Sequence, residues 1–140
     1  MQELRIEDFP LRSFDKVRYA DTDRQGHVNN AVFSSFLETG RVEVLYSKEL
    51  PVLSEGASFV IASLKLDFAS EITWPGQVEI GTGILKIGNS SIILYQELFQ
   101  GGIRVAKAET IIVQIHNDTK ASFSLGENAK GILKRWLLNR

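Results

Sequence analysis

Residues 29–47 read NNAVFSSFLETGRVEVLYS, and this stretch decides the fold of the chain. Asn29 or Asn30 is a good N-cap, because a short side-chain oxygen can accept a hydrogen bond from the first turn of a helix. Apolar residues then recur at intervals of three and four, which places them on one helical face. These residues are Phe33, Phe36, Leu37, Gly40, Val44 and Leu45. Val32 and Val42 widen the apolar surface, so we expect a long and deeply buried helix.

Small residues recur in this helix and in the strands predicted after it. Gly40 lies in the middle of the helix, where a glycine costs about 1 kcal/mol relative to alanine, and this predicts that another backbone approaches closely there. Gly81 and Gly83 share one face of a strand, and Ala106 and Ala108 share a face two segments further on. Small side chains make room for a bulky neighbour, and we expect the long helix to fill that room.

Most of the remaining chain is predicted to form strands. Residues 12–19 alternate loosely between apolar and polar side chains, which predicts a first strand. In residues 58–68 one alternate set is wholly apolar, so we expect it to form a core face. The members of this set are Val60, Ala62, Leu64, Leu66 and Phe68. Three further strands are expected over residues 78–87, 91–100 and 103–115.

The connections between the last three strands are short. Gly88-Asn89 and Gly101-Gly102 predict hairpin turns, which join antiparallel neighbours and therefore predict a meander. Residues 127–138 carry apolar side chains at helical spacing, so we expect a short amphipathic helix there. The order of strand, helix and four strands indicates an α+β fold, in which one helix lies on a strongly curved antiparallel sheet of about five strands.

Composition limits the classes of protein that the chain can belong to. It has 140 residues, with 16 Lys plus Arg, 17 Asp plus Glu, a formal net charge of −1 and no cysteine. One domain over residues 1–140 is expected, because no Gly-, Ser- or Pro-rich linker divides this length. The missing cysteines exclude disulfides and thiolate chemistry. The near-zero net charge argues against nucleic-acid binding. No apolar run approaches the roughly 20 residues of a membrane span, and the N-terminus does not resemble a signal peptide. We therefore expect a cytoplasmic protein.

The residues before the predicted helix carry the strongest chemical signal. Residues 17–30 read VRYADTDRQGHVNN, in which Asp21 and Asp23 precede a glycine, a histidine and the helix start. A helix N-terminus offers unpaired backbone N–H groups and the positive end of the helix dipole. Such donors can hold an oxyanion while a neighbouring carboxylate acts as base or nucleophile. The alternative is a tight loop whose Asp side chains only cap their own backbone.

Other kinds of site fit the sequence poorly. An EF-hand loop would match Asp21, Asp23, Gln25 and Gly26, but it needs a glutamate where Val32 stands. With two histidines and no cysteine, a zinc site is also disfavoured. No G-x-S-x-G sequence is present, and the glycines between positions 81 and 88 lack the further residues of a phosphate-binding loop. We expect no metal and no cofactor.

The stretch VRYADTDRQGHVNNAVFSSFLETGRVE closely resembles the active-site loop and central helix of hotdog-fold acyl-CoA thioesterases, in the 4-hydroxybenzoyl-CoA thioesterase-like branch. The family pattern is approximately Asp-x-Asp-x-x-Gly-His-Val-Asn-Asn, then an aromatic residue, then Glu-x-x-Arg. The matching residues are Asp21, Asp23, Gly26, His27, Val28, Asn29, Asn30, Phe33, Glu38 and Arg41. The resemblance continues to about residue 115. It implies a hotdog fold, with one long central helix wrapped by the sheet, and a homodimer or homotetramer with active sites at the dimer interface.

The resemblance also implies roles for individual residues. Asp23 takes the place of the catalytic carboxylate, either as a nucleophile that forms a mixed anhydride or as a general base toward water. The backbone N–H of Asn30 would hold the thioester oxygen. Substrate-binding positions are Gly26, His27, Val28, Asn29, Phe33, Ser90 and Ser91. Asp21 is expected to hold the loop. Glu38 and Arg41 lie three residues apart and can pair along the helix. We expect Glu38 to be structural or to lie at an interface.

The implied reaction is hydrolysis of a fatty or aromatic acyl-CoA to the free acid and CoA, without a cofactor. Apolar side chains expected near the site favour an aliphatic or aromatic acyl group; these belong to Val28, Phe33, Phe59 and Ile61. The turn at residues 88–91 is Gly-Asn-Ser-Ser where the 4-hydroxybenzoyl enzyme is basic, which argues against that substrate. Two alternatives are a thioesterase acting on acyl carrier protein and a non-catalytic acyl-binding module on the same fold. The intact Asp23 argues against the second.

Overall fold

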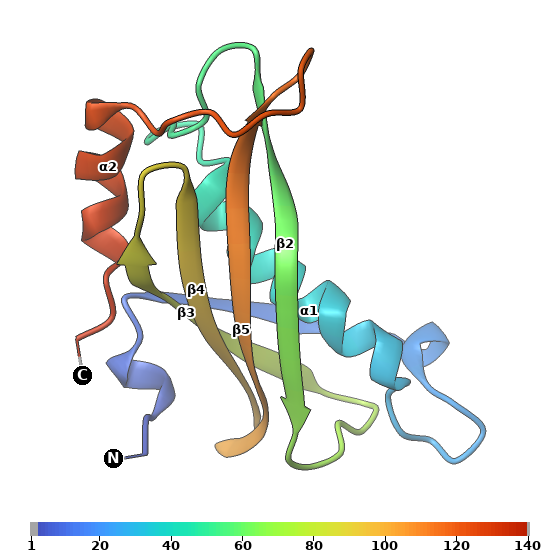
Figure 1. Ribbon diagram of the computed structural model, residues 1–140. Coiled ribbons are helices and arrows are strands. Elements are labelled where there is room, and N and C mark those ends of the chain that lie inside the picture. Colours follow the sequence, from blue (N-terminus) through green and yellow to red (C-terminus); the bar gives the residue numbers. More distant parts are fainter. Residues whose placement is uncertain (1–2, 140) are drawn as a thin grey trace.

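Five antiparallel strands and one helix of 16 residues build the protein, which is described over residues 3–139 from a computed structural model (Figure 1). The strands are β1 Leu11–Lys16, β2 Ala57–Phe68, β3 Gln77–Ile87, β4 Ser91–Gln100 and β5 Ile103–His116. The helices are α1 Asn30–Leu45 and α2 Glu127–Leu133, with 3-10 turns at Ile6–Asp8, Tyr19–Asp21 and Lys134–Trp136. The strands lie in the order β1-β3-β4-β5-β2, so β3, β4 and β5 form the predicted meander.

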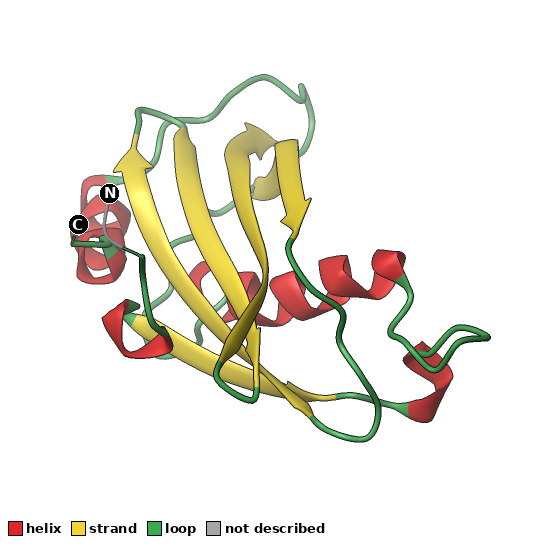
Figure 2. Ribbon diagram, turned by 90° about the horizontal axis from the view of Figure 1, so that it is seen from below, coloured by secondary structure: helices red, strands yellow, loops and turns green. Residues whose placement is uncertain are grey.

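The predicted curved antiparallel sheet with a helix on one face is confirmed. Figure 2 shows the sheet bending around α1, which crosses one face. The helix is shorter than predicted and begins at Asn30, because the Asn29 side-chain Oδ1 accepts a hydrogen bond from the Ala31 backbone N at 3.0 Å and so forms the N-cap. Its apolar stripe packs on the sheet as expected, with Phe33, Leu37 and Val44 all buried.

Gly40 lies where α1 comes closest to the sheet. A Cβ atom there would be 2.5 Å from Thr82 Oγ1, 2.7 Å from Gln96 Nε2 and 2.9 Å from Ile80 Cγ2. The predicted close approach is therefore present, but it is made by side chains of β3 and β4, whereas we predicted a backbone. Gln96 Nε2 also donates a hydrogen bond to the Leu37 carbonyl at 2.9 Å, which joins the helix to β4.

The glycines of β3 make room for a different neighbour from the one predicted. A Cβ at Gly81 would lie 2.4 Å from the ring of Phe9, and one at Gly83 would lie 2.9 Å from Leu138. Both positions face away from α1, so the chain ends fill this space and the prediction that α1 fills it is wrong. The two alanines of β5 are buried in the core that includes α1.

The prediction of a core face on β2 is confirmed only at Leu66, which packs against the core. Val60 and Leu64 are each 38% exposed and Phe68 is 50% exposed. One cause is that β2 is an edge strand paired only with β5, so much of it remains uncovered. Another is a bulge between Ile61 and Ser63, which interrupts the strict alternation on which the prediction rested.

The C-terminal segment follows the edge of β3 beyond the end of β1. The predicted helix over residues 127–138 is α2 followed by the turn Lys134–Trp136. Leu137 then forms a parallel bridge with Ile84, and the Leu138 backbone N donates to the Ile84 carbonyl at 2.9 Å. No helix in the described part of the chain has the length and hydropathy needed to cross a bilayer.

Candidate active site

The loop between β1 and α1 is held by the segment that follows β2. The Val28 backbone N donates to the Ile72 carbonyl at 2.8 Å, and His27 forms a β-bridge with Thr73. The Asn29 backbone N donates to the Asp21 carbonyl at 2.9 Å. These bonds fix the start of α1 relative to the end of β2, although the two segments are far apart in the sequence.

Asp21 is buried inside this loop and pairs with Arg18. Its Oδ1 lies 2.8 Å from Arg18 Nη2, and its Oδ2 accepts from the Arg18 backbone N at 2.8 Å. Burial alone would raise the pKa of Asp21, but the hydrogen bonds and positive charge of Arg18 outweigh it and lower that pKa below its ordinary value. The side-chain hydrogen bond to Asp21 is also the main reason that the pKa of Arg18 is raised. Both carboxylate oxygens of Asp21 thus accept hydrogen bonds from Arg18 within the loop.

Asp23 differs from Asp21 in having an uncommitted oxygen. Its Oδ1 accepts the backbone N–H groups of Gln25 at 2.8 Å and His27 at 3.2 Å, which fixes the side-chain direction. Among residues 3–139, Oδ2 makes no hydrogen bond, and the side chain is exposed. Gly26 lies at the tip of the same turn with φ +82°, a conformation that favours glycine. The loop therefore presents one oriented carboxylate oxygen to solvent.

That carboxylate lines an open cavity of about 390 Å³ together with the first turn of α1. The loop contributes Asp23, His27 and Val28, and the helix contributes Asn30 and Phe33. The Asn30 N–H makes no hydrogen bond to any part of the described chain, as expected for the first residue of a helix. Two residues that each carry an uncommitted group, the Asp23 carboxylate and the Asn30 backbone N–H, therefore line the same cavity.

The far wall of the cavity comes from residues that we did not predict. Phe68 and the three residues after it, Ala69–Glu71, line the same space. The Phe68 ring packs edge-to-face on Phe33 with centroids 4.9 Å apart. Glu71 Oε2 lies 3.1 Å from His27 Nε2, so it forms an ion pair when His27 is protonated. This segment carries no sequence motif of its own. It reaches the site only through its backbone contacts with residues 27 and 28.

The structure brings together most of the predicted site residues but separates others. Asn29 caps the helix beside the cavity without lining it. Ser90 and Ser91 lie in and after the β3–β4 turn, at the opposite end of the sheet from the loop (Figure 1). Phe59 and Ile61 do not line this cavity. Within a single chain, the expectation that they lie near the site is therefore wrong.

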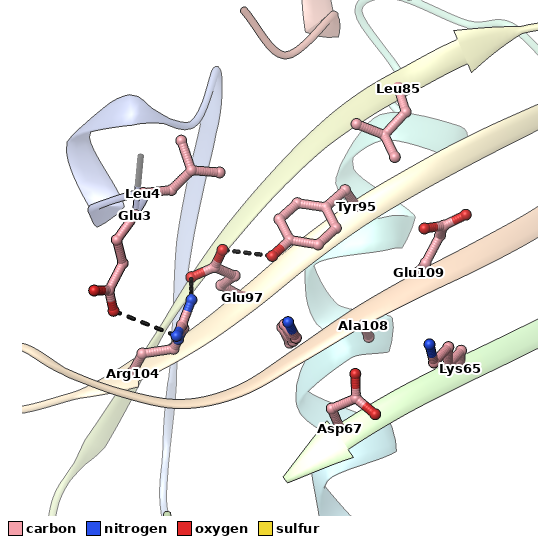
Figure 3. Close-up of a pocket in the computed structure, with 11 residues that line it drawn as sticks. Glu3, Leu4, Lys65, Asp67, Leu85, Tyr95, Glu97, Arg104, Ala108 and Glu109 are labelled. Carbon is pink, nitrogen blue, oxygen red and sulfur yellow. Dashed lines mark hydrogen bonds and ion pairs between the residues drawn. The ribbon is translucent and has the colours of Figure 1, made fainter. Parts of the chain in front are cut away.

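A larger cavity of about 500 Å³ lies on the sheet face opposite α1 (Figure 3). Three of its charged groups, Glu3, Glu97 and Arg104, are paired with one another within the chain. Tyr95 Oη donates to Glu97 Oε2 at 2.6 Å, and Arg104 lies 3.6 Å from Glu97 Oε1 and 3.3 Å from Glu3 Oε1. The smaller cavity places a carboxylate beside the N-terminal turn of a helix, and this combination makes it the better candidate for an active site.

Comparisons with known proteins agree with this fold. Acyl-CoA thioesterase YbgC of Helicobacter pylori is 31% identical over 84 residues, which is 60% of this chain and 63% of that protein. A thioesterase from Thermus thermophilus, solved in complex with coenzyme A and Zn, is 28% identical with a TM-score of 0.79, covering 96% of this chain and 98% of that one. The PA5185 protein of Pseudomonas aeruginosa shares the fold, with a TM-score of 0.85 at 21% identity and 96% coverage of both chains.

The match to the Helicobacter relative thus spans less than two thirds of that protein's length. The match to the family as a whole is more extensive. The model of the Thioesterase-like superfamily matches residues 17–135, which include the loop, α1 and all strands after it. On this match, the chain belongs to the Thioesterase-like superfamily.

Proposed function

We propose that this protein hydrolyses acyl-CoA thioesters to the free acid and CoA, with Asp23 as the catalytic carboxylate. The observation that carries the proposal is that Asp23, with an uncommitted Oδ2, and Asn30, with an uncommitted backbone N–H, line the same cavity. Thioester hydrolysis needs both kinds of group, because one must generate the attacking oxygen and the other must stabilise the oxyanion. The names of the Helicobacter and Thermus relatives support the same reaction.

Asp23 has two possible roles in this reaction. As a general base, it accepts a proton from water while the water oxygen attacks the thioester carbon and the C–S bond breaks. As a nucleophile, Asp23 forms a mixed anhydride and releases the CoA thiolate, and water then hydrolyses the anhydride. In both routes the thiolate takes a proton to leave as CoA-SH. The hydrogen bonds to Oδ1 orient the side chain and leave Oδ2 for either role.

The Asn30 N–H would stabilise the negative charge that develops on the thioester oxygen. Removing one such donor typically costs about 2.7–4 kcal/mol of transition-state stabilisation. The positive end of the α1 dipole adds about 0.3–1 kcal/mol. Asn29 supports this arrangement by capping the helix, and Phe33 with Val28 gives an apolar surface for the acyl group. Gly26 and His27 shape the loop next to the substrate.

The assembly that we propose is a homodimer or homotetramer with active sites at the dimer interface. One chain leaves the Asp23 cavity open and leaves Phe68 half-exposed beside it. A second copy would close the cavity over an acyl chain. Ser90 and Ser91 are proposed to bind a distant part of a long ligand such as CoA.

Thiol release tests the proposed reaction. Wild type, Asp23→Asn and Asp118→Asn would be compared on acyl-CoAs from acetyl to palmitoyl and on benzoyl types. Asp118 is exposed in the turn after β5, so its variant controls for the same chemical change elsewhere. We expect turnover by wild type and by Asp118→Asn, and a loss of about a thousandfold or more in Asp23→Asn. Full activity of Asp23→Asn would overturn the assignment, and no turnover of any CoA ester would favour acyl carrier protein or a binding module.

A single turnover in water labelled with heavy oxygen separates the two roles of Asp23. If Asp23 is a nucleophile, water attack on its carbonyl in the anhydride places the label in the Asp23 side chain. If Asp23 is a general base, the label appears only in the product acid, as it also does when water opens the anhydride at the acyl carbonyl, so label in Asp23 is the result that decides for the nucleophile. Mass spectrometry of the peptide containing Asp23 reads out the difference.

A further inference from the structure

The side chain of His27 is held by Glu71, which comes from a distant segment and lines the same cavity. Glu71 Oε2 lies 3.1 Å from His27 Nε2, and both residues line the cavity that contains Asp23. An ionised carboxylate can only accept hydrogen bonds, so His27 Nε2 carries a hydrogen in this contact. The contact thus makes one of the two ring nitrogens a fixed hydrogen-bond donor.

The other ring nitrogen of His27, Nδ1, is left to gain and lose a proton. A neutral imidazole has one N–H group and one lone pair, whereas the charged ring has two N–H groups. Because Nε2 keeps its hydrogen in both forms, the proton that distinguishes them lies on Nδ1. Within residues 3–139, Nδ1 makes no hydrogen bond. Glu71 therefore fixes the tautomer of His27 and leaves Nδ1 available to a ligand.

The backbone on both sides of Glu71 is anchored to the sheet. The Ser70 backbone N donates to the Val105 carbonyl at 3.1 Å. Thr73 exchanges two hydrogen bonds with the side-chain amide of Gln100, each 2.9 Å long. A residue that orients another side chain must itself be held in place, and these bonds meet that requirement. The Glu71 side chain is 66% exposed, and an ion pair so exposed adds little to stability, so stability is a poor explanation of the contact.

The backbone of His27 closes the turn that carries Asp23. The Asp23 backbone N donates to the His27 carbonyl at 2.7 Å, and the His27 backbone N donates to Asp23 Oδ1 at 3.2 Å. The two residues are thus joined in both directions, and α1 begins at Asn30 shortly after them. A carboxylate, an imidazole and a backbone N–H donor therefore come from one short hydrogen-bonded segment that lines one cavity.

The proposed hydrolysis needs a proton donor in addition to Asp23. An alkyl thiol such as that of cysteine has a pKa of about 8.5, so a departing alkyl thiolate takes up a proton at neutral pH. When Asp23 acts as a nucleophile, its carboxylate becomes acylated and holds no proton to give. When Asp23 acts as a base, it must pass on the proton that it took from water. A group that both donates and accepts a proton serves either route, and histidine is the side chain that most often does so.

We propose that His27 donates the proton that the CoA sulfur takes on leaving, and that Glu71 is the positioning residue that fixes the tautomer of His27. This inference rests on the proposed hydrolysis. The charged His27 gives its Nδ1 proton to the sulfur as the C–S bond breaks, which forms CoA-SH and neutral His27. In the nucleophilic route, Nδ1 then accepts a proton from the water that opens the anhydride, and this step yields the Asp23 carboxylate and the free acid. In the general-base route, protonated Asp23 passes its proton to Nδ1. Both routes consume one thioester and one water and restore the starting charges.

The basicity of the leaving thiolate tests this role of His27. Thioesters of one acyl group with CoA and with para-nitrothiophenol would be compared in wild type, His27→Gln, Glu71→Gln and Glu55→Gln. The aryl thiolate is a far weaker base than the CoA thiolate, so it leaves without a proton. Glutamine at position 27 keeps an N–H group for Glu71 but transfers no proton. Glu55 is exposed in the turn before β2, so its variant controls for the same chemical change elsewhere.

The quantity to compare is kcat/KM, because it covers the steps up to C–S cleavage and excludes later hydrolysis of an anhydride. For the CoA ester, we expect His27→Gln to lower kcat/KM by about a hundredfold or more and Glu71→Gln by about tenfold, with Glu55→Gln unchanged. For the aryl thioester, all three variants should stay within about fivefold of wild type. Equal losses on both esters would show that His27 only shapes the loop and would overturn the proposal. Full activity of His27→Gln on the CoA ester would overturn it as well.

Nuclear magnetic resonance reads the tautomer without any reaction. The chain has two histidines, so labelling them with heavy nitrogen gives two rings, and His27→Gln assigns the signals. We expect neutral His27 to carry its hydrogen on Nε2 in wild type and to be a mixture of tautomers in Glu71→Gln. A hydrogen on Nδ1 in neutral wild type, or the same His27 spectrum in Glu71→Gln, would overturn the role of Glu71. This measurement decides the proposal if the aryl thioester is not a substrate.

Asp23→Asn separates a failure of this inference from a failure of the proposed function. If Asp23→Asn is inactive and His27→Gln loses the same factor on both esters, the proton donor alone is wrong. If Asp23→Asn is fully active, or if wild type hydrolyses no CoA ester, the proposed function fails and the proton donor fails with it.

Discussion

The two ends of α1 differ in how completely the chain satisfies them. At the C-terminal end, Val44 and Leu45 pack in a closed apolar cluster with Leu133 of α2. At the N-terminal end, Asp23 and Asn30 border an open cavity with polar atoms that have no partner in the described chain. The closed end of the helix buries apolar side chains, whereas the open end keeps unpaired polar groups that suit the proposed binding of a substrate.

This contrast predicts that changes at the closed end affect stability and changes at the open end affect activity. Leu133→Ala has the largest expected effect on stability. Its side chain is fully buried, so truncation should lower the free energy of unfolding by about 2–5 kcal/mol. Urea unfolding measures this loss, and thiol release per folded molecule should stay unchanged. Leu53→Ala is the control, because Leu53 is 36% exposed and should lose much less.

Gly40→Ala tests the close contact between the middle of α1 and side chains of β3 and β4. The new methyl group would lie within 3 Å of Thr82, Gln96 and Ile80, so we expect a loss of about 1–3 kcal/mol in spite of the better helix propensity of alanine. Gly131→Ala in α2 is the matched control, because nothing lies within 4 Å of that position. There we expect a gain of up to about 1 kcal/mol in unfolding experiments. Equal effects at the two glycines would refute the close-packing argument.

Asn29→Ala sharpens the comparison at the open end. Loss of the cap should lower the free energy of unfolding by about 1 kcal/mol. Because the first turn of α1 carries the Asn30 donor, we expect kcat to fall by about tenfold or more. Steady-state kinetics and urea unfolding on one preparation separate the two effects. Asn29→Asp is the control, because it keeps a capping oxygen and should retain most of the activity. An unchanged kcat in Asn29→Ala would show that the cap has no role in aligning the site.

Asp21→Asn should have the smallest effect at neutral pH, below about 1 kcal/mol, because Arg18 is solvent-exposed. Its pKa is lowered in the folded protein, so its stabilising contribution is present above its unfolded pKa of about 3.9 and is lost as pH falls below that value. Urea midpoints at pH 7 and near pH 3 should therefore differ less in Asp21→Asn than in wild type. An unchanged acid dependence would show that Asp21 contributes nothing through its charge. Asp118→Asn serves as the exposed control.

Local signals predicted the elements that depend on neighbours in sequence. Asn29 forms the N-cap because its side chain needs only the next two residues. The hairpins at Gly88-Asn89 and Gly101-Gly102 are where they were predicted, because turn chemistry is local. The loop with Asp23 and the helix start with Asn30 were placed together because they adjoin in the sequence.

Features that depend on distant partners were not predictable in this way. The alternation in β2 looks like a core face, and only the sheet order shows that the strand is an edge. Gly81 reads as space for a helix, but Phe9 occupies it. Glu71 carries no motif, and it reaches His27 only because the backbone pairs at Thr73. Each of these depends on a contact between segments that the sequence keeps apart.

The bridge between Leu137 and Ile84 has a consequence for aggregation. Together with the short, charge-bearing β1, it covers the β3 side of the sheet, while β2 remains long and open on the other side. A sheet with one adhesive edge can join a single neighbour and then stops growing, whereas a sheet with two can polymerise into fibres. The last few described residues therefore cover part of the β3 edge, and cleaving them would leave a further open strand edge with which another chain can pair.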